Sequence, residues 1–276
     1  MFLKKNSFYR VNLSIWPITR AICIFCLFTL FFQFLMNELR FNCMFFSYLL
    51  KRTLFRTICV FLGWFNDFLT EATFLGLHTR RVQLSIKIGF ILFLFSEVML
   101  FFAFFWRLFH SRLNPSTYIG AVWPPKGIIP LSASGIPLLN TRLLISSGIY
   151  LTTRHLCFLT QESINPFYFT RRQSVFICAR ATCRAGFLFL LLQRFEYIHA
   201  LFDISDSIYA STFYMLTGLH GMHVLFGLIF LLIRFVRFGF YHYTTVHALN
   251  LECAIWYWHF VDIIWIFLFV SIYIRL

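Results

Sequence analysis

The sequence predicts an all-α, polytopic membrane protein, because it is too apolar to fold in water and its apolar residues fall into long runs. Of its 276 residues, 60% are hydrophobic and 12% are charged, whereas a soluble domain carries about 25% charged residues. A bilayer-spanning helix needs roughly 20 mostly apolar residues, so the chain has room for about seven spans with short connections. We therefore expect one membrane domain that covers residues 1–276.

Apolar runs divide the chain into seven predicted transmembrane helices, at residues 15–36, 42–65, 84–109, 138–160, 174–197, 207–235 and 248–274. The second of these carries Lys51, Arg52 and Arg56 in its middle. A charge at the centre of a membrane helix costs about 3 kcal/mol on insertion scales, so we expect these side chains to face protein or water, or the segment to bend there. The one long connection, residues 111–136, is rich in Pro and Gly and is expected to lie outside the hydrocarbon layer.

The distribution of positive charge indicates how the chain crosses the membrane. The formal net charge is +14, but the Lys and Arg residues are scattered instead of forming one basic face, which argues against nucleic-acid binding. If the connections alternate between the two sides, the N-terminal side receives Lys4, Lys5, Arg10, Arg80, Arg81, Arg171, Arg172 and Arg237. The opposite side receives Arg40, Arg112, Lys126 and Arg275. By the positive-inside rule, the N-terminus faces the compartment of synthesis.

Glu97 is an acidic residue in the middle of the third predicted helix, among Phe and Leu residues. An ionised carboxylate there loses its hydration, and no Lys or Arg lies one helical turn away, so we expect a buried carboxyl that is largely neutral. Such a group either exchanges protons or serves as a hydrogen-bonded structural acid, and the sequence leaves both interpretations open.

His220 and His223 lie three residues apart in the sixth predicted helix and therefore share one helical face. This spacing permits two metal ligands, but a metal site needs more, and the other histidines are isolated along the chain. We therefore expect packing and interhelical hydrogen bonds from these two residues, and no metal in this chain.

The last predicted helix carries polar and aromatic residues on two stripes. Positions 252, 256, 259 and 263 form one stripe, and positions 258, 262 and 265 form the other. A helix with two such stripes is expected to have protein around much of its surface. Glu252, His259 and Asp262 are costly inside a membrane unless they are paired, so they are candidates for function or for specifying helix contacts.

The segment from Glu252 to Leu268 resembles the final helix of subunit III of cytochrome c oxidase, whose pattern is E-x-A-x-WYWHFVD-x-x-W-x-F-L. The similarity continues in the family's order at residues 12–17, 96–99, 123–128, 137–141, 204–213 and 217–224. It covers nearly the whole chain.

This resemblance implies seven helices in two bundles, helices I–II within residues 1–70 and helices III–VII within residues 80–276, around a V-shaped cleft filled with lipid. It implies no redox metal in this chain, because heme a, heme a3 and copper belong to partner subunits. The implied partners are oxidase subunits I and II, accessory subunits and membrane phospholipids. The implied role is to stabilise subunit I, bind lipid and support proton uptake during electron transfer from cytochrome c to oxygen.

The resemblance also assigns particular residues. Glu97 matches the family's carboxyl on the third helix, while Glu71, His78 and Arg237 match positions around bound phospholipid head groups. The implied location is the mitochondrial inner membrane with the N-terminus on the matrix side, and a bacterial plasma membrane is the alternative.

The chain departs from the family at several positions. Thr70 replaces an Arg that the family usually has before Glu71, so one lipid-phosphate contact is absent. Arginines occupy positions where the family has small or apolar residues, at Arg20, Arg107, Arg142, Arg184 and Arg194. We expect them to snorkel, to pair with lipid or to contact accessory subunits.

Two other classes compete with the oxidase interpretation. A secondary transporter would explain Glu97 and Glu252 as intramembrane acids, but the chain lacks the repeated halves that transporters commonly have. An intramembrane di-metal oxygenase would need several clusters of histidine, which the sequence does not contain.

Overall fold

The computed structural model describes residues 14–37, 43–117, 120–159, 168–240, 242 and 249–274, and these residues contain helices but no β-strand. Seven α-helices and one π-helix follow in order: α1 (Trp16–Asn37), α2 (Cys43–Thr73), α3 (Arg80–Leu113), α4 (Ile136–Leu159), α5 (Tyr168–His199), α6 (Ile208–Gly239), α7 (Leu249–Leu268) and η2 (Phe269–Tyr273). The predicted all-α class with seven long helices is confirmed.

The helix bounds differ from the predicted spans mainly at the ends. Helix α2 continues to Thr73, well beyond the predicted end at residue 65. Between residue 65 and Gly76 the chain has no Gly or Pro, and Gly76 has a φ of 59°. A helix can extend past the apolar stretch that defines a span, since its backbone groups remain hydrogen-bonded in water. Helix α2 is also uninterrupted at Lys51, Arg52 and Arg56, and these side chains are exposed on the chain.

The chain divides into two compact units, residues 1–86 and 87–276. In the first unit, α1 packs against α2 near the beginning of the former and the end of the latter. The indole Nε1 of Trp16 donates a hydrogen bond to the Asp67 carboxylate, and the guanidinium of Arg20 lies 4.3 Å from the centre of the Trp64 ring. Arg20 therefore makes a cation–π contact within this unit.

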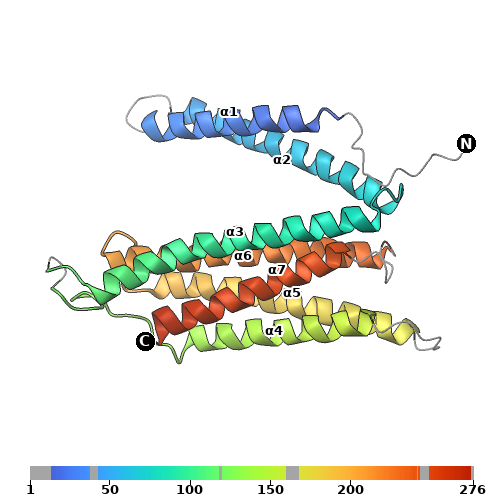
Figure 1. Ribbon diagram of the computed structural model, residues 1–276. Helices are drawn as coiled ribbons and strands as arrows, with labels where there is room; N and C mark the ends of the chain where they lie inside the picture. Colours follow the sequence, from blue (N-terminus) through green and yellow to red (C-terminus); the bar gives the residue numbers. More distant parts are fainter. Residues whose placement is uncertain are drawn as a thin grey trace, which may run out of the picture. The chain divides into compact units, whose positions relative to one another are not determined.

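In the second unit, α4, α5, α6 and α7 lie side by side with alternating direction (Figure 1). The largest fully buried side chains of the described residues include Trp258 and Trp265 of α7 and Phe189 of α5. Helix α3 meets α6 and α7 through long side chains: Phe90 packs on Phe230 and Phe101 packs on Phe260. The core of this unit is therefore built around α7.

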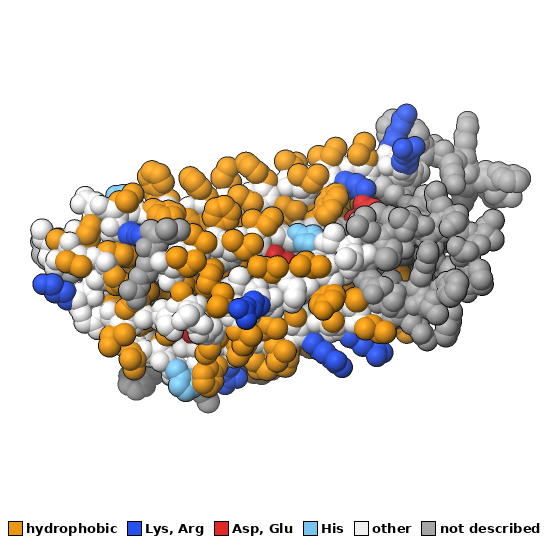
Figure 2. Space-filling model, turned by 90° about the horizontal axis from the view of Figure 1, so that it is seen from below, with side chains coloured by type: hydrophobic (Ala, Val, Ile, Leu, Met, Phe, Trp, Pro, Cys, Tyr) orange, Lys and Arg blue, Asp and Glu red, His pale blue; other side chains and the backbone are white. Residues whose placement is uncertain are grey.

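The described helices carry the surface expected of a protein in a bilayer. Four stretches are long and apolar enough to cross a membrane: Trp16–Gln33, Arg80–Leu113, Ile208–Gly239 and Leu249–Tyr273. Figure 2 shows one face of the molecule, where hydrophobic side chains cover most of the described surface and a few Lys and Arg side chains stand among them. The chain is thus a multi-pass membrane protein, as predicted.

Candidate functional site

The aromatic stripe of α7 faces α4 and is held there by two hydrogen bonds. The indole Nε1 of Trp258 donates to Ser147 Oγ at 3.0 Å, and that of Trp265 donates to Thr141 Oγ1 at 3.0 Å. Both tryptophans are fully buried. A buried indole N–H needs an acceptor, because an unmade hydrogen bond costs about 1–3 kcal/mol. The hydroxyl groups of α4 therefore fix how α7 is turned about its own axis.

Glycines allow α5 and α6 to approach the same helix closely. A Cβ atom added at Gly186 would lie 2.7 Å from Trp258 Cη2 and 2.7 Å from Leu228 Cδ1. A Cβ atom added at Gly227 would lie 3.2 Å from Trp258 Cε3. Small residues at such positions are typical of membrane helices, whose association depends on close packing. Trp258 is thus enclosed by three helices.

Glu97 of α3 is paired with His223 of α6, which lies 126 residues away in the sequence. Glu97 Oε2 lies 2.8 Å from His223 Nε2, and the Glu97 and His223 side chains are 20% and 10% exposed. The Glu97 side chain is therefore only partly buried in this chain. Other surfaces of α3 face outward, with exposed residues such as Leu92 and Phe95. The local sequence could not reveal this partner, since it comes from another helix.

The other ring nitrogen of His223 determines how protons are placed in this pair. His223 Nδ1 lies 2.8 Å from the carbonyl oxygen of Leu219, and a carbonyl can only accept, so Nδ1 carries a hydrogen. The Nε2 atom then either accepts from a protonated Glu97 or donates to its carboxylate. In both cases one proton lies between Glu97 and His223 and the pair has no net charge.

The polar stripe of α7 contacts two different helices. Lys87 Nζ of α3 lies 2.7 Å from Glu252 Oε2 and 5.9 Å from the centre of the Trp256 ring. Further along α7, His259 Nε2 lies 3.1 Å from Thr152 Oγ1 of α4. Glu252 therefore links α7 to α3, whereas His259 links it to α4.

Asp262 lies where α7 comes closest to α4. A Cβ atom added at Gly148 would lie 2.6 Å from Asp262 Oδ2, and that oxygen lies 4.0 Å from His259 Nδ1. The Asp262 side chain is 10% exposed. Gly148 thus makes room for a carboxyl group between the two helices.

His220 points away from the Glu97 pair and into the core. Its ring is fully buried and packs against Phe189 and Trp265, with ring centres 5.6 Å and 5.2 Å away. His220 and His223 therefore serve different helix contacts, although they are close in sequence. Within the described ranges, no group of three or more His, Cys, Asp or Glu residues could hold a metal ion.

Glu71 and His78 come together in the first unit, at the connection between α2 and α3. His78 is 9% exposed, its ring packs on Phe68 at 4.9 Å, and its carbonyl oxygen accepts a hydrogen bond from Gln83 Nε2 at 3.1 Å. Burial lowers the pKa of His78 below its usual value, and the nearby Glu71 carboxylate opposes this shift only in part. Arg237 belongs to the second unit, in the last turn of α6, and is 8% exposed.

The family model for cytochrome c oxidase subunit III matches residues 6–275. The chain belongs to this family. Cytochrome c oxidase subunit 3 of Myxine glutinosa and that of Paracentrotus lividus are each 41% identical to it over 276 residues, covering 99% of the chain and 98% of each relative. The protein of the same name from Phoca vitulina is 41% identical over 268 residues, with 97% of both chains covered.

The resemblance to subunit III that the sequence motifs indicated is thereby confirmed, since all of them lie within the matched residues. In this subunit III chain, two of the predicted acidic residues pair directly with a basic residue on another helix. Glu97 pairs with His223, and Glu252 pairs with Lys87. Of the other predicted polar residues of the core, His220 contacts α5 and α7, His259 contacts α4, and Asp262 lies against Gly148 of α4 and near His259.

One buried acidic group was missed by the sequence analysis. Glu196 of α5 is 3% exposed, and Gln193 and Tyr273 beside it are each 4% exposed. Gln193 and Glu196 are three residues apart, so the available signal was a second polar pair on one helical face near the end of the fifth predicted span. This signal was weak because its third member, Tyr273, lies 77 residues further along the chain.

Proposed function

We propose that this chain acts as the non-redox subunit III of a cytochrome c oxidase, in which heme a, heme a3 and copper belong to partner subunits. The observation that carries this proposal is the family match over residues 6–275. Its own contribution to electron transfer and proton pumping is indirect: it stabilises subunit I, binds phospholipid and supports proton uptake. The relatives bearing the name cytochrome c oxidase subunit 3, alike in length, support membership in such a complex.

Support for proton uptake is assigned to Glu97 and His223. Their pair holds one proton between Oε2 and Nε2 at a separation of 2.8 Å, and either atom can carry it. Transfer of this proton from the carboxyl to the imidazole leaves the total charge of the pair at zero, because it converts a neutral acid and a neutral ring into a carboxylate–imidazolium pair. The partly exposed carboxyl gives the pair a route to the surface of α3.

Phospholipid binding is assigned to Glu71, His78 and Arg237. An arginine near the membrane surface pairs with a lipid phosphate, and a neutral imidazole can donate one hydrogen bond to it. The lowered pKa of His78 keeps its ring neutral at pH 7, in agreement with this role. We assign lipid head groups to Glu71 and His78 in the first unit and to Arg237 in the second unit.

The assigned location is the mitochondrial inner membrane, with the N-terminus on the matrix side. The excess of Lys and Arg in the connections on the N-terminal side supports this orientation. The organisms of the similar proteins, a hagfish, a sea urchin and a seal among them, favour it over the bacterial plasma membrane.

Purification of the assembly through a tag on this chain tests the proposal. In mild detergent, heme a and copper should co-purify with the chain, and the complex should oxidise cytochrome c. Absence of heme a from an otherwise stable preparation would contradict membership in an oxidase.

The Glu97→Gln variant of the same complex tests the proton assignment, with heme a content as the control for assembly. The amide keeps a donor for His223 Nε2 but cannot release a proton, so we expect normal heme content with slower proton uptake or a shorter turnover lifetime. Turnover identical to wild type in rate and lifetime would contradict a role in proton uptake and would show that Glu97 is a structural acid.

A further inference from the structure

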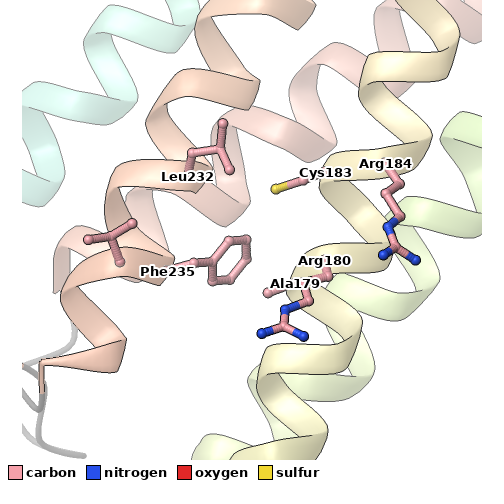
Figure 3. Close-up of a pocket in the computed structure, with 7 residues that line it drawn as sticks. Ala179, Arg180, Cys183, Arg184, Leu232 and Phe235 are labelled. Atoms are coloured by element: carbon pink, nitrogen blue, oxygen red, sulfur yellow. The ribbon is translucent and has the colours of Figure 1, made fainter.

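An apolar groove lies between α5 and α6 on the surface of the second unit. It has a volume of about 380 Å³ and is lined by Ala179, Arg180, Cys183, Arg184, Leu232, Phe235 and Val236. Figure 3 shows that Cys183 of α5 and the side chains of Leu232 and Phe235 of α6 point toward one another across it. The volume is within the usual range of small-molecule sites, about 300–1,000 Å³.

The two arginines of this groove are arranged to hold an anion. Arg180 and Arg184 are four residues apart on α5, so they project from adjacent turns of one face, and both are exposed. Figure 3 shows both side chains extending toward the beginning of α5. Within the part of the chain that the structure describes, neither guanidinium has a carboxylate within ion-pair distance. Two like charges at this spacing repel one another, and an anion between them removes the repulsion.

The position of the arginines in the fold favours a lipid phosphate as this anion. The beginning of α5 and the end of α6 lie at the same end of the unit, because the two helices are antiparallel. Arg237 in the last turn of α6 marks that end as basic. Arginine side chains inside a bilayer extend toward the nearer interface, where lipid phosphates lie. The apolar part of the groove then continues from the phosphate into the hydrocarbon layer.

The size of the groove decides between a lipid chain and a helix of another protein. One turn of an α-helix, about 10 Å wide and about 5.4 Å long, already fills about 420 Å³. The groove, at about 380 Å³, holds less than one such turn. A single acyl chain is narrower and flexible, and it can follow the apolar side chains along the groove.

We propose that this groove binds one anionic phospholipid, with its phosphate between Arg180 and Arg184 and one acyl chain against Leu232, Phe235 and Val236. Glu71, His78 and Arg237 are not among the residues that line this groove, although Arg237 directly follows Val236. The proposal depends on the chain lying in a bilayer and does not depend on its role in an oxidase.

Two variants of the intact complex test the two halves of the site. Arg180→Gln with Arg184→Gln removes the charge and keeps the groove, while Val236→Trp fills the groove and keeps the charge. Arg194→Gln is the matched control, because Arg194 is an exposed arginine of the same helix outside the groove. Each complex is placed in phosphatidylcholine nanodiscs with increasing phosphatidylglycerol, and lipid retained per chain is measured by mass spectrometry after exchange into lipid-free detergent.

We expect the wild type and the Arg194→Gln control to retain one more phosphatidylglycerol than either groove variant. Because the double arginine variant removes two charged hydrogen bonds, it should weaken retention at least about tenfold. Equal retention in all four proteins, or equal retention of phosphatidylcholine and phosphatidylglycerol by the wild type, would overturn the proposal. Displacement of the lipid by millimolar inorganic phosphate would also overturn it, because the acyl chain would then contribute nothing.

The remaining occupant, a helix of an accessory subunit, gives a different result. In that case the groove variants lose a protein component and no phospholipid, which overturns the proposal. Lipid is counted per chain and heme a is measured separately in the same samples. Loss of heme a from all samples, wild type included, would therefore concern the oxidase assignment and leave the lipid comparison intact.

Discussion

Helices α1 and α7 are both apolar enough to span a membrane, yet the chain surrounds them very differently. None of the membrane-spanning stretch of α1 is buried within the chain, whereas 67% of the stretch from Leu249 to Tyr273 is buried. Helix α1 has no acidic residue, while α7 carries Glu252, His259 and Asp262 in addition to its tryptophans. Hydropathy therefore predicts that both helices lie in the bilayer, whereas the polar residues distinguish the helix that is buried within the protein.

The physical reason is that lipid tails are as apolar as leucine. Burying another Leu or Ile against protein gains little inside a bilayer, so helices associate through close packing and interhelical hydrogen bonds. Helix α7 has both: glycines of α4, α5 and α6 face it, and its tryptophans donate to hydroxyl groups of α4. Helix α1 packs against α2, and its contacts there include a hydrogen bond from Trp16 and a cation–π contact from Arg20.

The largest expected difference between the two regions comes from a matched pair of glycines. Gly186→Ala places a methyl group 2.7 Å from the fully buried Trp258 ring, which cannot move, so we expect a loss of about 1–3 kcal/mol in folding free energy. Gly63→Ala meets Trp16 at 2.6 Å, but Trp16 is only half-buried and can shift. The gain in helix propensity of about 1 kcal/mol then offsets the strain.

Thermal denaturation of the intact complex, followed by release of this chain, measures both variants. Gly186→Ala should lower the release temperature clearly, and Gly63→Ala should leave it nearly unchanged. Equal effects of the two substitutions on the release temperature would mean that both units accommodate an added methyl group equally well. That result would contradict the difference expected from the burial of Trp258 and Trp16.

A second, smaller difference is expected for tryptophans. Trp258→Phe removes the donor to Ser147 and part of a fully buried ring, which should cost about 2 kcal/mol. Trp64→Phe, at a position 38% exposed, weakens the contact with Arg20 and should cost at most about 1 kcal/mol. The same release temperature is the measurement. A larger effect for Trp64 would show that contacts in the first unit are stronger than their exposure indicates.

The Glu97 pair separates shape from charge. Glu97→Gln keeps the hydrogen bond to His223, so the folding free energy should stay within about 0.5 kcal/mol of wild type. The release temperature should then be nearly unchanged. Glu97→Ala leaves His223 without this partner and should cost about 1–3 kcal/mol. Infrared difference spectra of the two complexes identify the carboxyl band. A Gln variant that fails to assemble would contradict a Glu97 carboxyl that carries the shared proton.

The smallest expected effect concerns pH at His78. Because burial lowers its pKa in the folded chain, the unfolded chain binds a proton more readily, and stability falls as pH drops below the usual histidine value of about 6.5. Stability from this group is fully present above that pH. Limited proteolysis of the connection between α2 and α3 in the intact complex should therefore become faster at lower pH. His78→Gln should remove the pH dependence, and persistence of the dependence in that variant would assign it to another group.

Most of the fold could be predicted because it depends on local composition. All seven predicted spans coincide with helices, and the two-stripe pattern of the last one indicated that protein surrounds it. The ends were less predictable, as at Thr73, because apolarity stops at the membrane surface while helical hydrogen bonds continue.

The partners of the polar residues could not be predicted in this way. His223 and Lys87 were present in the sequence, but nothing near Glu97 or Glu252 identifies them, because each pair joins two helices. Glu196 was missed for the same reason, because its neighbour Tyr273 belongs to η2, at the far end of the chain.

The sequence by itself determined that this chain lies in a membrane, crosses it with seven long helices and belongs to the subunit III family, because hydropathy and contiguous motifs are local properties. Only the tertiary structure decided which carboxyl groups are paired, which glycines enclose Trp258, and that Arg180 and Arg184 border an apolar groove. The physical reason is that pairing, close packing and grooves arise between helices whose relative rotation and depth are fixed by many weak contacts together.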